Sequence, residues 1–363
     1  MDAHHYLIPL AVAFGVAALM TPLVMRLAIA IGVTDHPNER SVSRRPNMPL
    51  LGGMAVGLGF AAGLAVAIRQ VEPAIPAGHL FALILGGAIV LAAGIYDDRF
   101  GMSAWTKFTL QIIAAALAIG SGYEIDHLTE PFSRTTFVLP IWLSWTATLL
   151  WIVIVTNAIN LVDGLDGLAA GVAAIIAATL AFLAAQAGEL FGVCVGVAMV
   201  GALLGFLPFN FAPARIFLGD TGALFIGYVL SLLALEGYRQ ITLLTFVVPV
   251  LALAVPILDT ALSVIRRMRN RAPIFNADRA HMHHCMLESE GSARSAVLQV
   301  YILTAAFCLI SLAFSKLDGY MALVFLAVVA FFTYRLVANL GALATPQDPT
   351  ASGELALNPG ENE

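Results

Sequence analysis

Long uninterrupted runs of apolar residues constrain the fold of this chain more than any other feature. A helix needs about 20 apolar residues to cross the hydrocarbon core of a bilayer, and none of these runs alternates like a β-barrel strand. The sequence therefore predicts an all-α polytopic integral membrane protein with about 11 transmembrane helices. They are expected at 6–31, 50–68, 79–96, 104–121, 139–157, 168–186, 190–207, 222–236, 241–265, 297–315 and 319–338.

The composition excludes several other classes of protein. Only 11% of the 363 residues are charged and 60% are hydrophobic, whereas a soluble domain carries about 25% charged residues. A net charge of −5 and the lack of a long basic block argue against nucleic acid as a partner. The three cysteines form no Cys-x-x-Cys pair, so a disulfide scaffold is unsupported.

The basic residues predict the orientation in the membrane. If the apolar runs are numbered from the N-terminus, 14 of the 18 Lys and Arg residues lie on one side of the membrane. They are found in or beside the loops that follow the first, third and other odd-numbered runs, and beside the C-terminal tail. The positive-inside rule then places the N-terminus outside and the C-terminus in the cytoplasm. We expect one catalytic domain over 1–340 and a disordered tail over 341–363. The expected cytoplasmic loops are 34–49, 97–103, 158–167, 208–221 and 266–296.

Those same loops carry most of the polar chemistry. Asp97 and Asp98 stand at the end of the third run, and adjacent carboxylates at a membrane boundary are costly unless they are paired or bind a cation. They could bind Mg²⁺, act as a base, or pair with Arg99 as solvated acids. Asp220 could be the N-cap of the helix that follows it, while Arg215 in the same loop favours phosphate binding.

The third inner loop has a polar helical face. Residues spaced 3, 4, 3 and 4 apart lie on one side of a helix, which would let a polar group approach the backbone closely. Asp163 and Asp166 flank this face. A packing stripe explains the glycines but not two Asn and two Asp in an apolar chain. The face consists of Asn157, Asn160, Gly164, Gly167 and Gly171.

The fifth inner loop contains His281, His283 and His284 beside five arginines. Zinc binding is disfavoured because the adjacent His283 and His284 rarely reach one metal together. Phosphate binding by the imidazoles is the favoured interpretation. In the ninth run, Pro249 and Pro256 are expected to bend the helix and open a groove for a lipid chain.

Acids, arginines, histidines and amides gathered on one face predict a diphosphate substrate held through Mg²⁺. The sequence has no Walker A motif, which disfavours an ATP-driven pump. The acids lie at helix ends rather than at mid-bilayer, which argues against a transporter of lipid phosphate or nucleotide sugar.

Six segments, taken in this order, resemble a known family. The likeness, over about residues 6 to 315, is to the polyprenyl-phosphate N-acetylhexosamine-1-phosphate transferases (glycosyltransferase family 4), which include the MraY translocase. It is greatest to the WecA/TagO-type undecaprenyl-phosphate GlcNAc-1-phosphate transferases. The segments are D-x-P-N-x-R with P-x-x-G-G (35–53), Y-D-D-R with S-A-x-x-K-F (96–108), N-A-I-N-L-V-D-G-L-D-G-L-A (157–169), P-A-R-I-F-L-G-D-T-G (213–222), P-I-L-D-T (256–260) and H-M-H-H (281–284).

The resemblance implies a reaction at the cytoplasmic face of the bacterial inner membrane. UDP-GlcNAc and undecaprenyl phosphate would give GlcNAc-diphosphoundecaprenol and UMP, with Mg²⁺ or Mn²⁺ as cofactor, in the initiation of cell-surface polysaccharide synthesis. Asp220 would be the principal metal ligand. Asp97 would be the base or activator of the lipid phosphate, and Asp98 would support Asp97 or the metal. Both a one-step transfer and a covalent aspartyl-phosphate intermediate are compatible with the sequence.

The resemblance also implies a substrate-binding set. Asp163, counted with the catalytic carboxylates, would line a nucleotide pocket in which Asp166 is nearest the uracil. The remaining expected substrate contacts are Asn160 and Leu165 in that pocket, and Asn210, Arg215, His281, His283 and His284 at the diphosphate and sugar. Lys107 is also expected to bind substrate. A homodimer is compatible with the sequence.

The first inner loop departs from the family pattern, because Ser43 stands where a His is usual. This departure leaves the role of that loop open. The same transfer with UDP-MurNAc-pentapeptide or with another UDP-2-acetamido sugar is the main alternative, and a transporter is the remote one.

Overall fold

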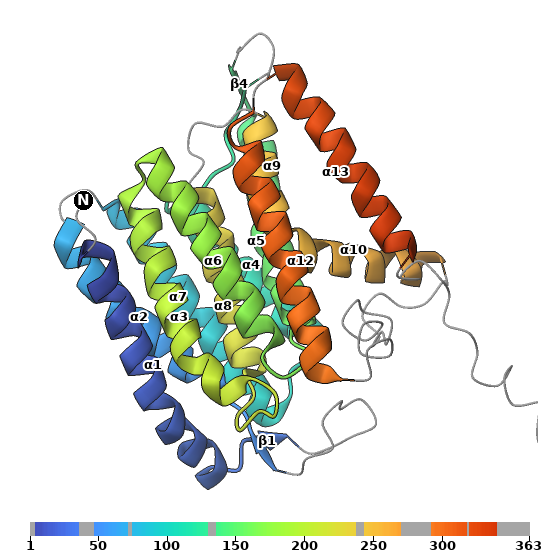
Figure 1. The fold of residues 1–363 in the computed structure, drawn as a ribbon. Helices are drawn as coiled ribbons and strands as arrows, with labels where there is room; N and C mark the ends of the chain where they lie inside the picture. The colour runs from blue at the N-terminus through green and yellow to red at the C-terminus, as the bar shows by residue number, and fades with distance from the viewer. Residues whose placement is uncertain are drawn as a thin grey trace, which may run out of the picture.

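The computed structural model describes residues 4–35, 47–71, 75–129, 136–236, 243–269, 292–317 and 319–339. They form a bundle of helices that run mostly side by side (Figure 1). The helices are α1 (His4–Ala30), α2 (Gly52–Val71), α3 (Ala77–Phe100), α4 (Ala104–Gly120), α5 (Ile141–Val162), α6 (Leu168–Ala187), α7 (Leu190–Asn210), α8 (Gly219–Glu236), α9 (Leu243–Ala252), α10 (Ala254–Arg269), α12 (Ala293–Phe314) and α13 (Gly319–Asn339).

Eight helices within the described ranges are long and apolar enough to cross a membrane. They are α1, α2, α3, α5, α6, α7, α8 and α12, and α4 and α13 add two shorter apolar helices. The prediction of an all-helical polytopic membrane protein is therefore confirmed. Apolar side chains such as Leu19 and Trp142 are exposed on the outside of the bundle, as expected of a surface that contacts lipid.

Helix α8 lies at the centre of the bundle. Every residue from Thr221 to Glu236 is buried, and α2, α3 and α5 pack around the helix. A Cβ at Gly86 of α3 would lie 2.0 Å from the Tyr228 hydroxyl oxygen, so only glycine leaves room for this ring. The Tyr228 hydroxyl donates to the Ala82 carbonyl oxygen at 3.0 Å. Because α8 is buried on all sides, the polar residues of its first turn contact several neighbouring helices.

Two short hairpins lie at opposite ends of the bundle (Figure 1). Strand β1 (Thr34–Asp35) pairs antiparallel with β2 (Met48–Pro49) between α1 and α2, with Thr34 opposite Pro49. Strand β3 (His127–Thr129) pairs with β4 (Thr136–Val138) between α4 and α5. Ser43, in the atypical part of the first inner loop, lies outside the described residues.

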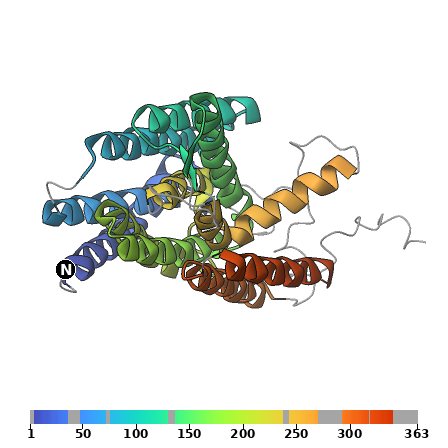
Figure 2. The same cartoon turned by 90° about the horizontal axis from the view of Figure 1, so that it is seen from above.

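The run at 241–265, which we expected to be one bent span, is instead divided at Leu253 into α9 and α10. Pro256 has no N–H to donate to the Ala252 carbonyl. The Cys308 thiol of α12 donates to that carbonyl oxygen at 3.7 Å, and the Ser311 hydroxyl donates to the Val248 carbonyl oxygen at 2.7 Å. Figure 2 shows α10 projecting sideways out of the bundle.

The helices extend further into the predicted inner loops than we expected. Helix α3 continues to Phe100, so Asp97 and Asp98 lie on its last turn rather than in a loop. Helix α5 ends at Val162, past the expected start of the third loop, because its polar residues find hydrogen-bond partners on neighbouring helices. The fourth loop is shortened in the same way, by α7 and α8.

Candidate active site

The first turn of α8 brings together residues from four helices. Asp97 comes from the last turn of α3, Lys107 from the first turn of α4, and Asn160 from the last turn of α5. All three surround Asp220, the second residue of α8. The sequence predicted each of these residues for the site, and the structure places them in contact.

Asp220 accepts a hydrogen bond on each carboxylate oxygen. The Lys107 ammonium donates to Oδ2 at 2.5 Å, and the Asn160 amide donates to Oδ1 at 2.5 Å. Lys107 is also ion-paired with Asp97. The side chain of Asp220 keeps 28% of its surface exposed, and Lys107 keeps 20%. One ammonium group therefore links two carboxylates at an accessible end of the bundle.

The carboxylate of Asp98, a residue of α3, binds the first turn of α8. Its Oδ1 accepts the Asp220 amide at 2.9 Å, and its Oδ2 accepts the Thr221 amide at 3.1 Å and the Thr221 hydroxyl at 2.6 Å. A carboxylate that binds the free amides of a first helical turn acts as a cap. Asp98, reaching from α3, thus caps the helix for which Asp220 was one candidate cap, and it does not act as a solvated acid beside Arg99.

Gly219 makes this cap possible. Its φ is +71°, and a Cβ at this position would lie 2.4 Å from Asp98 Oδ2. Gly94 and Gly53 bring two further backbones against the same turn: their Cβ atoms would lie 2.4 Å from Thr221 Cα and 2.1 Å from the Gly222 nitrogen. Glycine at these positions therefore allows the backbones of α2 and α3 to pack directly against the first turn of α8.

The backbone amides of the paired glycines that follow the first loop form hydrogen bonds with the α7–α8 loop. The Gly52 amide donates to the Phe217 carbonyl oxygen at 3.1 Å, and the Gly53 amide donates to the Leu218 carbonyl oxygen at 3.0 Å. These two hydrogen bonds fix the segment that leads into Asp220.

A second pair of polar residues lies one helical turn further into the bundle than the Asp220 cluster. Gln111 follows Lys107 on the same face of α4, and Asn157 precedes Asn160 on α5. The Asn157 amide donates to Gln111 Oε1 at 2.5 Å and to the Val153 carbonyl oxygen. Gln111 is buried. Gln111 was not among the predicted site residues, although its spacing of four residues from Lys107 is the signal that could have identified it.

The turn between α5 and α6 carries Asp163, Leu165 and Asp166. Asp166 Oδ2 accepts the Ala214 amide at 2.9 Å and so ties this turn to the α7–α8 loop. Burial, together with the negative charges of Asp220, Asp98 and Asp166, raises the pKa of Asp163 well above its usual range. Leu165 is buried in the core and presents little surface to a ligand.

The end of α7 and the α7–α8 loop carry the two remaining predicted contacts that the structure describes. Asn210 is buried, and its side-chain amide donates to the Ile216 carbonyl oxygen at 3.0 Å, which shapes the loop. Arg215 is exposed on the loop surface. The predicted residues His281, His283 and His284 lie outside the described residues.

Helix α12 contacts both loops, which the sequence did not indicate. The Tyr301 hydroxyl donates to the Gly167 carbonyl oxygen at 2.5 Å, and Arg294 Nε donates to the Ala212 carbonyl oxygen at 2.7 Å. A tyrosine in an apolar run resembles an ordinary membrane residue, so no local signal identifies it.

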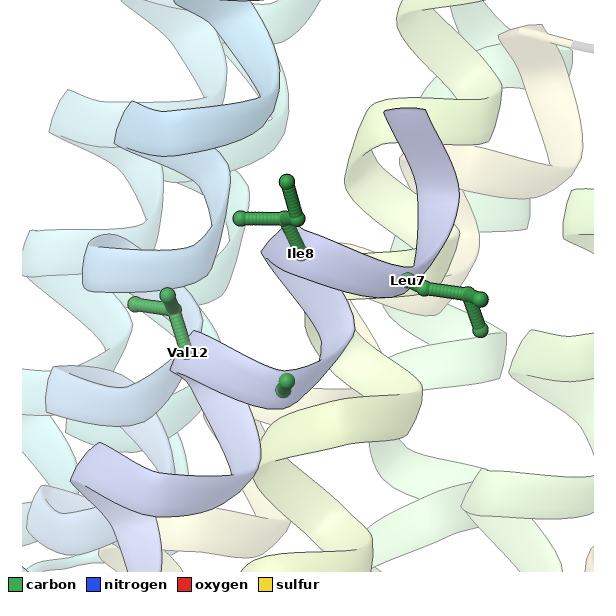
Figure 3. A pocket seen from close by; sticks show the side chains of 4 residues that line it. Leu7, Ile8 and Val12 are labelled. Carbon is green, nitrogen blue, oxygen red and sulfur yellow. The ribbon is translucent and has the colours of Figure 1, made fainter. Parts of the chain in front are cut away.

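A separate hollow of about 510 Å³ lies on α1. Figure 3 shows its walls, and the residues that form them are all aliphatic: Leu7, Ile8, Ala11 and Val12. Aliphatic side chains offer no group that could bind a phosphate or a metal, so the chemistry is assigned to the Asp220 cluster.

Comparison with known proteins identifies the family. Glycosyl transferase family 4 matches residues 80–238, which include the Asp220 cluster. A probable undecaprenyl-phosphate N-acetylglucosaminyl 1-phosphate transferase of Bacillus subtilis is 37% identical over 342 residues, covering 93% of each chain. The chain belongs to glycosyl transferase family 4. The family predicted from the six sequence segments is thereby confirmed.

Two further relatives show the range of the family. A decaprenyl-phosphate N-acetylglucosaminephosphotransferase of Mycolicibacterium smegmatis is 35% identical, over 78% of this chain and 75% of the relative. A phospho-N-acetylmuramoyl-pentapeptide-transferase of Lacticaseibacillus paracasei is 32% identical, over 67% of this chain and 79% of the relative.

Proposed function

We propose that this protein transfers GlcNAc-1-phosphate from UDP-GlcNAc to undecaprenyl phosphate, releasing UMP. The product is the lipid-linked diphosphate sugar that initiates cell-surface polysaccharide synthesis. The observation that carries the proposal is the Asp97–Lys107–Asp220 cluster, in a chain that aligns over 93% of its length with a relative named for this transfer.

The membrane arrangement is part of the proposal. Eleven spans with the N-terminus outside would place the Asp220 end of the bundle in the cytoplasm, where UDP-sugars are available. The distribution of Lys and Arg among the loops supports this orientation. The membrane would then be the inner membrane of a bacterium.

The residues at the site fit a divalent cation such as Mg²⁺ or Mn²⁺. Asp97 and Asp220 both contact the Lys107 ammonium, so the two carboxylates are close enough to share one positive charge. No group of three or more acidic, His or Cys side chains within the described residues is arranged to hold a metal. Mg²⁺ suits such a site, because it binds through one or two carboxylates and completes its coordination with water and substrate phosphates. When bound, the cation would neutralise charge on the diphosphate.

The reaction forms one P–O bond and breaks another. An oxygen of the lipid phosphate attacks the phosphorus that carries the sugar, and the anhydride bond breaks so that UMP leaves with the bridging oxygen. Asp97 orients the acceptor phosphate and takes its last proton. Lys107 neutralises charge that develops on the transferred group, and Asn160 holds Asp220 in place.

The sugar is the least constrained part of the proposal. The Lacticaseibacillus relative, named for a muramoyl-pentapeptide transfer, makes UDP-MurNAc-pentapeptide the second candidate donor. The reacting phosphates would be the same with either donor, so the Asp220 cluster supports both. Discrimination would depend on the parts of the site that face the sugar.

A donor panel tests the proposal. The purified protein would be assayed in detergent with undecaprenyl phosphate, Mg²⁺ and one UDP-sugar at a time, by UMP release and by label transfer to lipid. We expect UMP with UDP-GlcNAc, and its loss on addition of EDTA. UMP with UDP-MurNAc-pentapeptide alone would replace the donor, and no UMP from any sugar with a folded protein would refute the transferase.

A further inference from the structure

Tyr301 of α12 lies on the glycine face of the turn between α5 and α6. A Cβ at Gly171 would lie 2.0 Å from the Tyr301 hydroxyl oxygen, so the ring occupies space that only glycine leaves open. The hydroxyl then donates to the Gly167 carbonyl oxygen at 2.5 Å. The polar group that this face was predicted to admit is therefore a side chain of the protein itself.

Gly167, whose carbonyl oxygen Tyr301 binds, is the residue directly after Asp166. Gly167 has a φ of +80° and begins α6 without a side-chain cap. Glycine is the residue with the greatest backbone freedom, so the hydroxyl restrains a point of the turn at which the backbone could otherwise move. Asp166 is therefore held from two sides: its carboxylate accepts the Ala214 amide, and Tyr301 binds the residue that follows it.

Helix α12 also holds the other side of this bridge. Arg294 binds the Ala212 carbonyl oxygen, two residues before Ala214. The Asp166–Ala214 hydrogen bond therefore lies between two attachments to one helix. A single rigid element fixes the α5–α6 turn relative to the α7–α8 loop.

We propose that Tyr301 is a positioning residue for the donor nucleotide: it makes no contact with substrate but holds the Asp166 turn in the conformation that binds UDP-GlcNAc. This inference rests on the proposed function, in particular on nucleotide binding at that turn. Without the hydroxyl, the turn spends less time in the binding conformation, and donor affinity falls by the same factor.

The test is Tyr301→Phe, which removes only the hydroxyl. One buried hydrogen bond contributes about 1 kcal/mol, which corresponds to about a fivefold change in an equilibrium. We expect the KM for UDP-GlcNAc and the calorimetric Kd for UMP to rise about fivefold. The kcat and the KM for undecaprenyl phosphate should stay within about twofold of the unmodified protein.

Tyr228→Phe is the matched control, since it removes another hydroxyl that donates to a backbone carbonyl in the core. The inference is overturned if Tyr301→Phe leaves UMP affinity unchanged, or if Tyr228→Phe changes it equally. Asp166→Ala separates the two levels of the argument. If Asp166→Ala weakens UMP binding and Tyr301→Phe does not, the positioning role fails alone; if neither does, the proposed nucleotide site fails as well.

Discussion

Lys107 and Asp220, 113 residues apart in sequence, are joined by a 2.5 Å hydrogen bond between the ammonium and Oδ2. The same ammonium is paired with Asp97. This contact brings the ends of α3, α4 and α8 to one point. It accounts for the position of Lys107, the single charged residue of α4.

Replacement of Lys107 by Met is expected to lower kcat by about 10² to 10³, the usual loss when one charge-stabilising donor is removed. It should also lower the melting temperature measured in EDTA, because Asp97 and Asp220 lose their shared counter-charge. Lys316→Met removes an exposed lysine that binds Gln186 and should leave kcat unchanged. Equal activity of the two variants would show that Lys107 is not catalytically important.

Asp98 is expected to stabilise α8 through its cap. Asp98→Ala leaves two backbone amides and one hydroxyl without their acceptor, so it should reduce the free energy of unfolding by about 1 to 3 kcal/mol. Asp98→Asn keeps one acceptor oxygen and should cost less. Chemical denaturation in detergent measures both variants, and equal stability of all three proteins would contradict the capping role.

The Gln111–Asn157 pair should behave as a coupled unit. Gln111→Leu leaves the Asn157 amide without this acceptor, whereas replacing both residues by Leu removes donor and acceptor together. A double-mutant cycle should give a coupling energy of about 1 kcal/mol, in the range measured between membrane helices. Purely additive losses of stability would show that the two side chains do not act together.

The raised pKa of Asp163 predicts that the stability of the folded protein depends on pH. Its pKa in the folded protein lies well above the usual 3.8, so between these two values the folded state binds more protons than the unfolded state. Stability from this group therefore falls as pH rises through that interval. Asp163→Asn should melt at a higher temperature than the unmodified protein at pH 7 in EDTA.

The advantage of Asp163→Asn should shrink as the pH falls towards 4 and disappear only below both pKa values, where the carboxyl is protonated in both states. A melting-temperature difference that does not change between pH 4 and pH 7 would contradict the raised pKa. Asp126→Asn, which replaces a half-exposed acid beside β3, is a suitable control.

The sequence was sufficient to predict which polar residues gather at the start of α8 but not the contacts that hold them there. Carboxylates at the ends of apolar helices are conspicuous, and Asp97, Lys107, Asn160 and Asp220 do come together. Asp98 was found as well, yet its partners could not be predicted, because the amides that it binds belong to a helix more than 120 residues away. Such a contact depends on tertiary packing, which no local pattern encodes.

The same limit applies to the fold. Prolines 249 and 256 predicted a bend, but a complete break at Leu253 also requires partners for the carbonyls that the bend releases. Those partners, Cys308 and Ser311, come from another helix. Tyr301 could not be predicted as a support of the α5–α6 turn for the same reason.

We propose that Asp220 is the principal ligand of the divalent cation in this phosphoglycosyl transfer, and Asp220→Asn tests that proposal most directly. UMP release would be titrated with Mg²⁺, and Mn²⁺ binding would be followed by electron paramagnetic resonance, with Asp126→Asn as control. The account predicts that Asp220→Asn loses at least about 10² in kcat at saturating Mg²⁺ and binds Mn²⁺ more weakly, while the control does neither. Near-normal turnover of folded Asp220→Asn with an unchanged Mg²⁺ requirement would contradict it.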